Sequence, residues 1–294
     1  MKDLTVSSDI SRSKLTSAYF LLLLTAFGWG LSTVLGKGMI GSISPTHILM
    51  VRAWVAVLVI FCASPGKLLA MKKGDLKAGL FLGLILFFSY YLGIYCLKYT
   101  TASKAGFLMA LSVLFVPSAE TLLKRRLPSW WIVFSVFLSL LGLRLISGIN
   151  GGSFNYGDLL AVGSACLYTL YIIVMDRIGK GKDDYLLSFI LLLVLAVAAS
   201  CGAVGLEGFN YAGIKENIYP LLLMGVAGTG LATLFQTKAQ KTASSESVGI
   251  ILLAEPLFTL IFAALFLHET IYLSGLMGGV LILLSLFVAV VKKV

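Results

Sequence analysis

Glu255 and Pro256 stand side by side in ILLAEPLFTLIF, residues 250–261, a run that is otherwise almost wholly apolar. A carboxylate is costly to bury, and a proline has no backbone N–H, so the carbonyl of Leu252 loses its helical partner. Inside a membrane, both features are tolerated where they face other protein groups or a wet cavity. The pair therefore predicts that this face of the segment points inward.

Two interpretations of Glu255 remain open. If the segment begins near Glu246, Glu255 lies about 13 Å deep, close to the middle of a hydrocarbon core about 30 Å thick. A carboxylate at that depth can take up a coupling proton or hold a substrate ammonium group. Alternatively, a neutral or hydrogen-bonded Glu255 locks two helices together while Pro256 shapes a kink.

Arg52 is the second charged residue inside an apolar segment, and three interpretations remain open. Its guanidinium can grip a substrate carboxylate in a fork. It can pair with Glu255, because the expected depths of the two residues are compatible. It can also be structural, by binding loop carbonyls or by extending to the membrane surface.

Trp29 and Tyr168 are expected near the membrane midplane and Tyr90 slightly outside it, although aromatic belts normally lie at the interfaces. They can line a cavity that holds an organic cation or an aromatic solute. The alternative is ordinary helix packing.

Thr229 belongs to GVAGTG, residues 225–230, which superficially resembles a phosphate-binding loop. The segment lies within an apolar run, lacks a preceding strand and does not match the G-x-x-x-x-G-K-[ST] spacing. Its small residues instead let helices approach closely. We expect Thr229 to offer a hydrogen bond to a cavity.

The elements that position these residues are predicted to be membrane-spanning helices. Of the 294 residues, 59% are hydrophobic and 12% are charged, against about 25% charged in soluble domains. Ten windows are long and apolar enough to span a bilayer: 17–37, 45–63, 78–97, 103–123, 129–147, 157–176, 185–205, 217–237, 246–267 and 271–291. The sequence therefore predicts an all-α integral membrane protein.

The net charge of +10 follows the predicted topology. With a cytoplasmic N-terminus, 17 of the 23 Lys and Arg residues fall on the cytoplasmic side, as the positive-inside rule expects. We therefore expect a multi-pass protein of the cell membrane with both termini in the cytoplasm. The basic residues are expected to meet anionic lipid rather than nucleic acid.

The ten windows divide into two sets of five at the turn-rich NGGSFNYGD, residues 150–158. We expect a tail over 1–16 and two repeats over 17–149 and 157–291. Their hydropathy patterns align, with Trp29 over Tyr168. Because five is odd, the second repeat must be inverted relative to the first, a design that recurs in transporters.

The order of these features resembles the EamA-type members of the drug/metabolite transporter superfamily. The residues that carry the resemblance are AFGWGLSTVLGK in the first window, Arg52 in the second and LAEPLFTLIFAALFLHE in the ninth. The resemblance implies ten helices around a central cavity and a secondary active transporter. It also implies alternating access for a small organic metabolite, such as an amino acid, usually in export.

The two halves depart from one another at their corresponding ends. Arg125 in the first half stands where the second has Glu269, and Pro117 lies five residues nearer its turn than Pro256. We expect helix breaks at both prolines. Without a nucleotide-binding domain, the energy is expected to come from ion or solute gradients. The sequence does not identify the coupling ion, and a proton taken up by Glu255 is one candidate.

The alternative function is a channel or a membrane-embedded interaction protein without carrier activity. We expect no enzyme, because the windows hold neither H-E-x-x-H nor a nucleophile–base pair. The four cysteines lie singly, and His47 and His268 have no companion at ligand spacing, so we expect neither a metal nor a cofactor. The sequence sets no oligomeric state.

Overall fold

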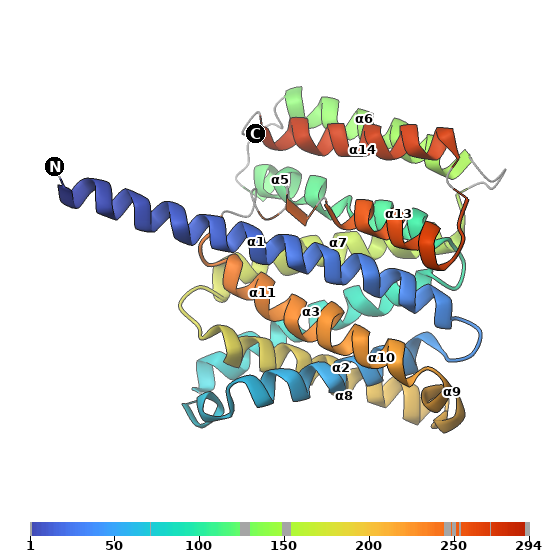
Figure 1. Ribbon diagram of the computed structural model, residues 1–294, viewed down its shortest axis with the longest axis horizontal. Coiled ribbons are helices and arrows are strands. Elements are labelled where there is room, and N and C mark those ends of the chain that lie inside the picture. The colour runs from blue at the N-terminus through green and yellow to red at the C-terminus, as the bar shows by residue number, and fades with distance from the viewer. Residues whose placement is uncertain are drawn as a thin grey trace.

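The computed structural model describes residues 2–70, 72–123, 130–148, 154–243, 248, 251–252, 254–270 and 272–291. Over these ranges the chain forms helices and turns, with one isolated bridge between Ile40 and Ile43 and no β-sheet. The long helices run roughly side by side (Figure 1). The predicted all-α class is confirmed.

The helices follow the predicted windows. In the first half they are α1 (Lys2–Met39), α2 (Pro45–Ala63), the short 3-10 helix η1 (Pro65–Ala70), α3 (Lys73–Cys96), α4 (Ala102–Met109), α5 (Ser112–Leu123) and α6 (Trp130–Gly148). In the second half they are α7 (Tyr156–Ile178), α8 (Asp184–Leu206), α9 (Tyr211–Glu216), α10 (Ile218–Gly225), the π-helix η2 (Val226–Leu231), α11 (Ala232–Ala239), α13 (Ala254–Phe266) and α14 (Leu273–Val291).

By length and composition, seven helical segments among the described residues can cross a membrane. They are Leu15–Met39, Pro45–Ala63, Lys73–Cys96, Ala102–Leu123, Tyr156–Ile178, Asp184–Leu206 and Ile218–Ala239. Two shorter apolar helices fall in the ninth and tenth predicted windows, and α6 falls in the fifth. The predicted start of the ninth window, at Glu246, lies outside the described residues.

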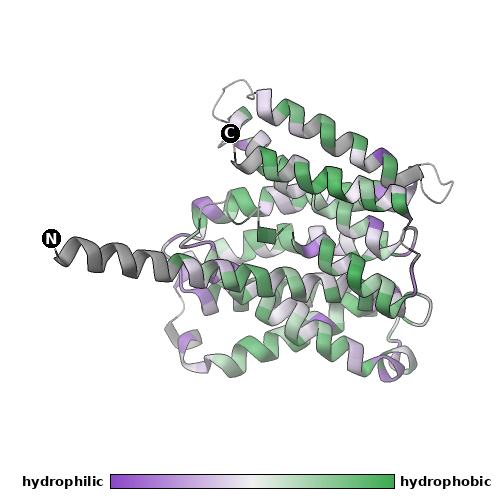
Figure 2. Cartoon of the chain, turned by 45° about the horizontal axis from the view of Figure 1, so that its top comes forward, coloured by the Kyte–Doolittle hydropathy of each residue, from purple (hydrophilic) through white to green (hydrophobic). Residues whose placement is uncertain are grey.

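The lipid-facing character of the helices is visible on the outside of the molecule. Hydrophobic residues predominate along the helices (Figure 2). Phe20, Leu58 and Trp130 are examples of large apolar side chains that are exposed. A soluble protein rarely exposes apolar surface so widely, so this pattern fits a membrane environment.

Local signals in the sequence start several of the helices. The Ser44 side chain accepts a hydrogen bond from the backbone N–H of His47, and Pro45 occupies the first turn of α2. At α7, Asn155 and Asp158 each accept from the other's backbone N–H, at 3.0 and 2.8 Å. These caps fix where the chain enters each span.

The helix contacts between the two halves occur in matched pairs. Helix α2 packs on α8 and α6 packs on α14, and these two pairs lie on opposite sides of the molecule (Figure 1). In order along the chain, α1 of the first half corresponds to α7 of the second, α3 to α11, and α4 with α5 to α13. The contact of α3 with α7 then corresponds to that of α11 with α1, and the contact of α1 with α13 corresponds to that of α7 with α4 and α5. Exchanging the halves thus maps each of these contacts onto another of them.

Two of the spans are interrupted near their middles. The fourth turns at Ala110 and Leu111, between α4 and α5, and helix α5 then continues through Pro117. The eighth widens into the π-helix η2. Interruptions of this kind free backbone groups, which inside a membrane must be met by protein groups or a cavity.

Candidate functional site

The interruption of the fourth span borders a cavity, and the π-helix η2 contacts Arg52, one of the residues that line it. The space between atoms there amounts to about 820 Å³, including the part that opens out of it. Side chains reach it from α1, α2, α3, α7 and α13 and from the turn between α4 and α5.

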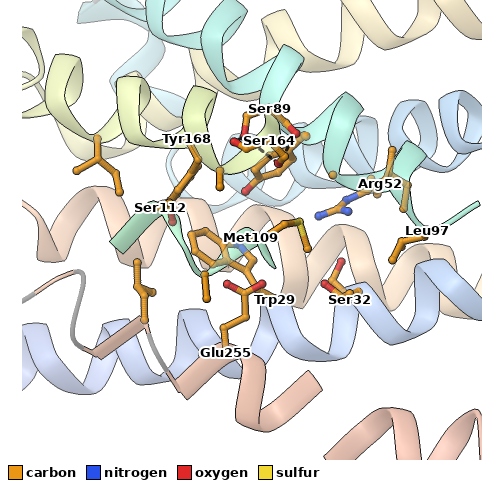
Figure 3. A pocket seen from close by; sticks show the side chains of 18 residues that line it. Trp29, Ser32, Arg52, Ser89, Leu97, Met109, Ser112, Ser164, Tyr168 and Glu255 are labelled. Atoms are coloured by element: carbon orange, nitrogen blue, oxygen red, sulfur yellow. Dashed lines mark hydrogen bonds between the residues drawn. The ribbon is translucent and has the colours of Figure 1, made fainter. Parts of the chain in front are cut away.

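The cavity gathers five of the six residues that the sequence singled out for substrate binding or coupling. Trp29, Arg52, Tyr90, Tyr168 and Glu255 all line it. Figure 3 labels four of them, all except Tyr90. The sixth, Thr229, is fully buried in η2 and touches Arg52 instead. Residues from both halves of the chain therefore meet in one place.

Arg52 is held by the π-helix. Its Nε donates to Thr229 Oγ1 at 2.8 Å, and its Nη2 donates to the Gly228 carbonyl at 3.3 Å. The guanidinium carbon also lies 5.3 Å from the centre of the Tyr90 ring, within cation–π distance. Thr229 in turn donates to the Met224 carbonyl at 3.0 Å. Arg52 thus ties α2 to η2.

Close packing explains why η2 is rich in small residues. A Cβ added at Gly228 would lie 2.6 Å from Ser32 Cβ and 2.9 Å from the Gly28 carbonyl oxygen. A Cβ at Gly225 would lie 2.4 Å from Val55 Cβ. Glycine therefore lets η2 fit between α1 and α2, as small residues do between membrane helices.

Glu255 lies on a different side of the cavity, with its carboxylate extended toward Trp29 (Figure 3). Its side chain is half-buried and, within the described part of the chain, forms no hydrogen bond or ion pair. In particular, it forms no ion pair with Arg52. Glu255 is thus a carboxylate in a largely apolar cavity, with no partner among the described residues.

The backbone around Glu255 is fixed by packing against α1. Pro256 lies in the first turn of α13, and Thr259 Oγ1 donates to the Glu255 carbonyl at 3.0 Å. A Cβ at Gly30 would lie 2.7 Å from Phe258 Cβ and 3.1 Å from the Glu255 carbonyl oxygen. The close approach at Gly30 brings Glu255 to the cavity.

Aromatic rings form another part of the cavity wall. Trp29 and Tyr168 meet edge to face with ring centres 5.5 Å apart, and Tyr168 stacks on the buried Tyr171 at 5.6 Å. The Tyr168 hydroxyl accepts a hydrogen bond from Gln236 Nε2 on α11. These contacts fix the orientation of Tyr168 from both halves of the chain.

Several polar groups of the site were not singled out from the sequence. Ser89 and Ser164 exchange hydrogen bonds where α3 crosses α7: the Ser89 hydroxyl donates to the Ser164 carbonyl at 3.1 Å, and the reverse bond is 2.8 Å. Ser32 is 3% exposed, and its hydroxyl has no partner among the described residues. Ser32 follows Trp29 by three residues, so helical spacing alone places them on one face.

The described residues offer no evident metal site. No group of three His, Cys, Asp or Glu side chains comes together in the part of the chain that was searched. The chemistry that the cavity offers is therefore charge, hydrogen bonding and aromatic contact.

Comparison with known proteins gives consistent matches along the chain. A model of the EamA-like transporter family matches residues 16–148 and again residues 155–291. A protein of Archaeoglobus fulgidus named an uncharacterized transporter is 27% identical over 270 residues, covering 91% of this chain and 83% of its own. Another of that name, from Clostridium kluyveri, is 23% identical over 283 residues, covering 91% of each chain.

One solved crystal structure has a similar fold. It superposes with a TM-score of 0.70 over 94% of this chain and 97% of its own, at 17% identity. At that identity the likeness concerns the fold alone.

Proposed function

Because this chain belongs to the EamA-like transporter family, we propose that it is a secondary active transporter that exports a small organic metabolite, an amino acid or related solute, by alternating access. The coarser description, a multi-pass membrane transporter for a small molecule, follows from the family and from the transporter-named relatives. The observation that carries the finer proposal is the central cavity, into which Glu255 projects with no hydrogen-bond or ion-pair partner in the described part of the chain.

The two halves act, in this proposal, as inverted repeats over 17–149 and 157–291. The matched helix contacts support it, since a pseudo-two-fold relation between the halves would generate such a set. The separate family matches to each half also support it. Two related halves can exchange packing arrangements, so that the cavity opens first to one side and then to the other.

Each end of the molecule is tied by contacts that would have to break for the cavity to open there. At one end the loop between α7 and α8 carries Lys182, which lies 3.0 Å from Asp75, and Asp183, which lies 2.8 Å from Lys67. Positive charge is dense at this end, so we place it in the cytoplasm of the cell membrane, together with both termini.

At the other end, Glu269 joins the second half to the first. Its carboxylate accepts from the backbone N–H groups of Ala102 and Ser103 at 2.8 and 3.2 Å, and so caps α4. A second tie there is the ion pair between Lys104 and Asp158, at 2.6 Å. Opening each end in turn would expose the cavity to one compartment at a time.

Glu255 is the residue that we propose for proton coupling. A half-buried carboxylate becomes neutral when it binds a proton. Moving the ionised carboxylate through the membrane costs more free energy than moving the protonated, neutral form. Trp29, Tyr90 and Tyr168 would enclose the body of the substrate.

Counterflow in proteoliposomes tests this function. Vesicles are loaded with pooled unlabelled amino acids, polyamines, nucleobases or vitamins, and the uptake of one labelled member of each pool is followed. Transient accumulation above equilibrium in one pool is expected of a carrier. Electrical conductance without counterflow would instead indicate a channel.

A further inference from the structure

We propose that the cavity recognises its substrate through a protonated amino group held at Glu255, and that a substrate carboxylate is not required. The substrate class is then an amine with an apolar or aromatic body, and an amino acid binds chiefly through its ammonium group. This inference rests on the transport function proposed above and names the chemistry of the same cavity.

The first argument is the state of Glu255. Its carboxylate projects into the cavity, and no described residue offers it a hydrogen bond or a counter-charge. A charged group in a low-dielectric site is strongly stabilised by a partner of opposite sign. A bound ammonium supplies that charge and up to three N–H donors.

The second argument is that Arg52 is already engaged. The edge of its guanidinium formed by Nε and Nη2 is occupied by Thr229 and Gly228, and Tyr90 lies over the group. A carboxylate seeking a forked contact at this edge would have to displace both bonds and disturb η2. Arg52 is therefore a positioning residue for the π-helix, and this edge of its guanidinium is already taken.

The third argument is the wall beside Glu255. The Trp29 and Tyr168 rings meet at 87°, so they present two differently oriented surfaces to the cavity. Aromatic faces attract cations and also pack against apolar groups. The buried Ser32 hydroxyl, which has no partner among the described residues, gives one further hydrogen bond.

Binding of matched ligands to the purified full-length protein tests the inference by isothermal titration calorimetry. One set shares a phenylethyl body: phenethylamine, phenylalanine and 3-phenylpropanoate. A second set shares a branched aliphatic body: 3-methylbutylamine, leucine and 4-methylpentanoate. In at least one set, the amine is expected to bind at least as tightly as the amino acid and ten times more tightly than the carboxylate.

Variants locate the contact. We expect Glu255→Gln to weaken amine binding at least tenfold and Glu255→Asp to retain most of it. Glu216→Gln, which makes the same change at an exposed site outside the cavity, is expected to leave binding unchanged. If Glu255→Gln does not fold, the affinities of the two ligand sets for the wild-type protein and for Glu255→Asp still test the inference.

Three results would overturn the inference: tighter binding of the carboxylate than of the amine, no amine binding in either set, or equal amine affinity in folded Glu255→Gln. Counterflow of a non-amine solute together with absent amine binding would remove the inference and leave the transport function standing. Glu255-dependent amine binding without counterflow of any solute would support the inference and count against transport.

Discussion

The two ends of the cavity carry opposite charges in very different surroundings. At one end, Arg52 is buried, hydrogen-bonded to η2 and covered by Tyr90. At the other end, Glu255 is half-buried and has no partner among the described residues. Both are charged residues within apolar segments of the chain.

The difference indicates a structural role for Arg52 and a role in binding or coupling for Glu255. Arg52 meets groups that the π-helix makes available, so its removal is expected to disturb η2. The Glu255 carboxylate has no hydrogen bond or ion pair to lose among the described residues, so neutralising it is expected to change binding and coupling more than stability. The predictions below follow from this division.

The largest effect is expected from Gly228→Ala, at the Arg52 end. The added Cβ would meet Ser32 Cβ at 2.6 Å and the Gly28 carbonyl oxygen at 2.9 Å, so α1 and η2 must separate. We expect a loss of about 3 kcal/mol of stability, measured as a lower thermal midpoint in detergent. Gly205→Ala is the control, since a Cβ there meets no atom within 4 Å. An unchanged midpoint in Gly228→Ala would contradict the tight packing.

The next effect is expected from Glu255→Gln. Proton-linked flux should fall at least tenfold, which corresponds to about 1.4 kcal/mol, while the thermal midpoint stays near that of wild type. Flux is measured with and without a pH gradient in both proteins. Equal flux in mutant and wild type under both conditions would remove Glu255 from the mechanism.

Thr229→Val should have a smaller effect on stability and on ligand preference, and it tests the structural role of Arg52. It removes the acceptor of the Arg52 Nε hydrogen bond and should destabilise the protein by about 1 kcal/mol. It also frees one edge of the guanidinium for a carboxylate. The ratio of the affinity for phenethylamine to the affinity for 3-phenylpropanoate should therefore fall about threefold, which corresponds to about 0.7 kcal/mol. A preference that stays at the wild-type value would show that Thr229 does not keep Arg52 from carboxylates.

The smallest effect is expected at the Lys67–Asp183 ion pair, outside the spans. The hydrogen bond to Asp183 raises the pKa of Lys67. Burial acts to raise the pKa of Asp183, but the bonds from Lys67 and from the Leu186 and Tyr185 N–H groups lower it overall. Both residues are substantially exposed, so Lys67→Ala should cost only about 0.5 kcal/mol.

The pH dependence of this pair has a definite sign. The contribution of Asp183 is lost as the pH falls through its lowered folded-state pKa, and that of Lys67 is lost as the pH rises through its raised one. Both side chains are charged between about pH 5.5 and about pH 8.5. The thermal midpoint of Lys67→Ala should therefore lie below that of wild type by the same amount at both pH values. A difference that disappears at the lower pH would place a proton-sensitive contact here as well as at Glu255.

Much of the fold could be predicted from the sequence because its signals are local. Apolar windows locate the spans, and caps such as Ser44 and Asn155 mark where helices begin. The break in the fourth span was harder to place: Pro117 drew attention, but the chain turns at Ala110 and Leu111. The Ser112 carbonyl near this turn accepts from Thr169 of α7, at 3.3 Å, a contact distant in sequence.

The sequence predicts which residues line the site better than it predicts the contacts between them. Spacing along single helices placed Trp29, Tyr90, Tyr168 and Glu255 near the same depth, and all four line the cavity. The partners of Arg52 depend on the π-helix and on how α2 packs against it, and neither has a local sequence signal. For the same reason the hydrogen bond between Gln236 and Tyr168 could not be foreseen.

The most direct test of the division between the two charges is a structure of the protein with phenethylamine bound. The account predicts the ammonium nitrogen about 3 Å from a Glu255 carboxylate oxygen, with the aromatic body against Trp29 or Tyr168. It also predicts that Arg52 keeps its bonds to Thr229 and Gly228. An amine bound away from Glu255, or an Arg52 that has left η2 to meet the ligand, would contradict the account.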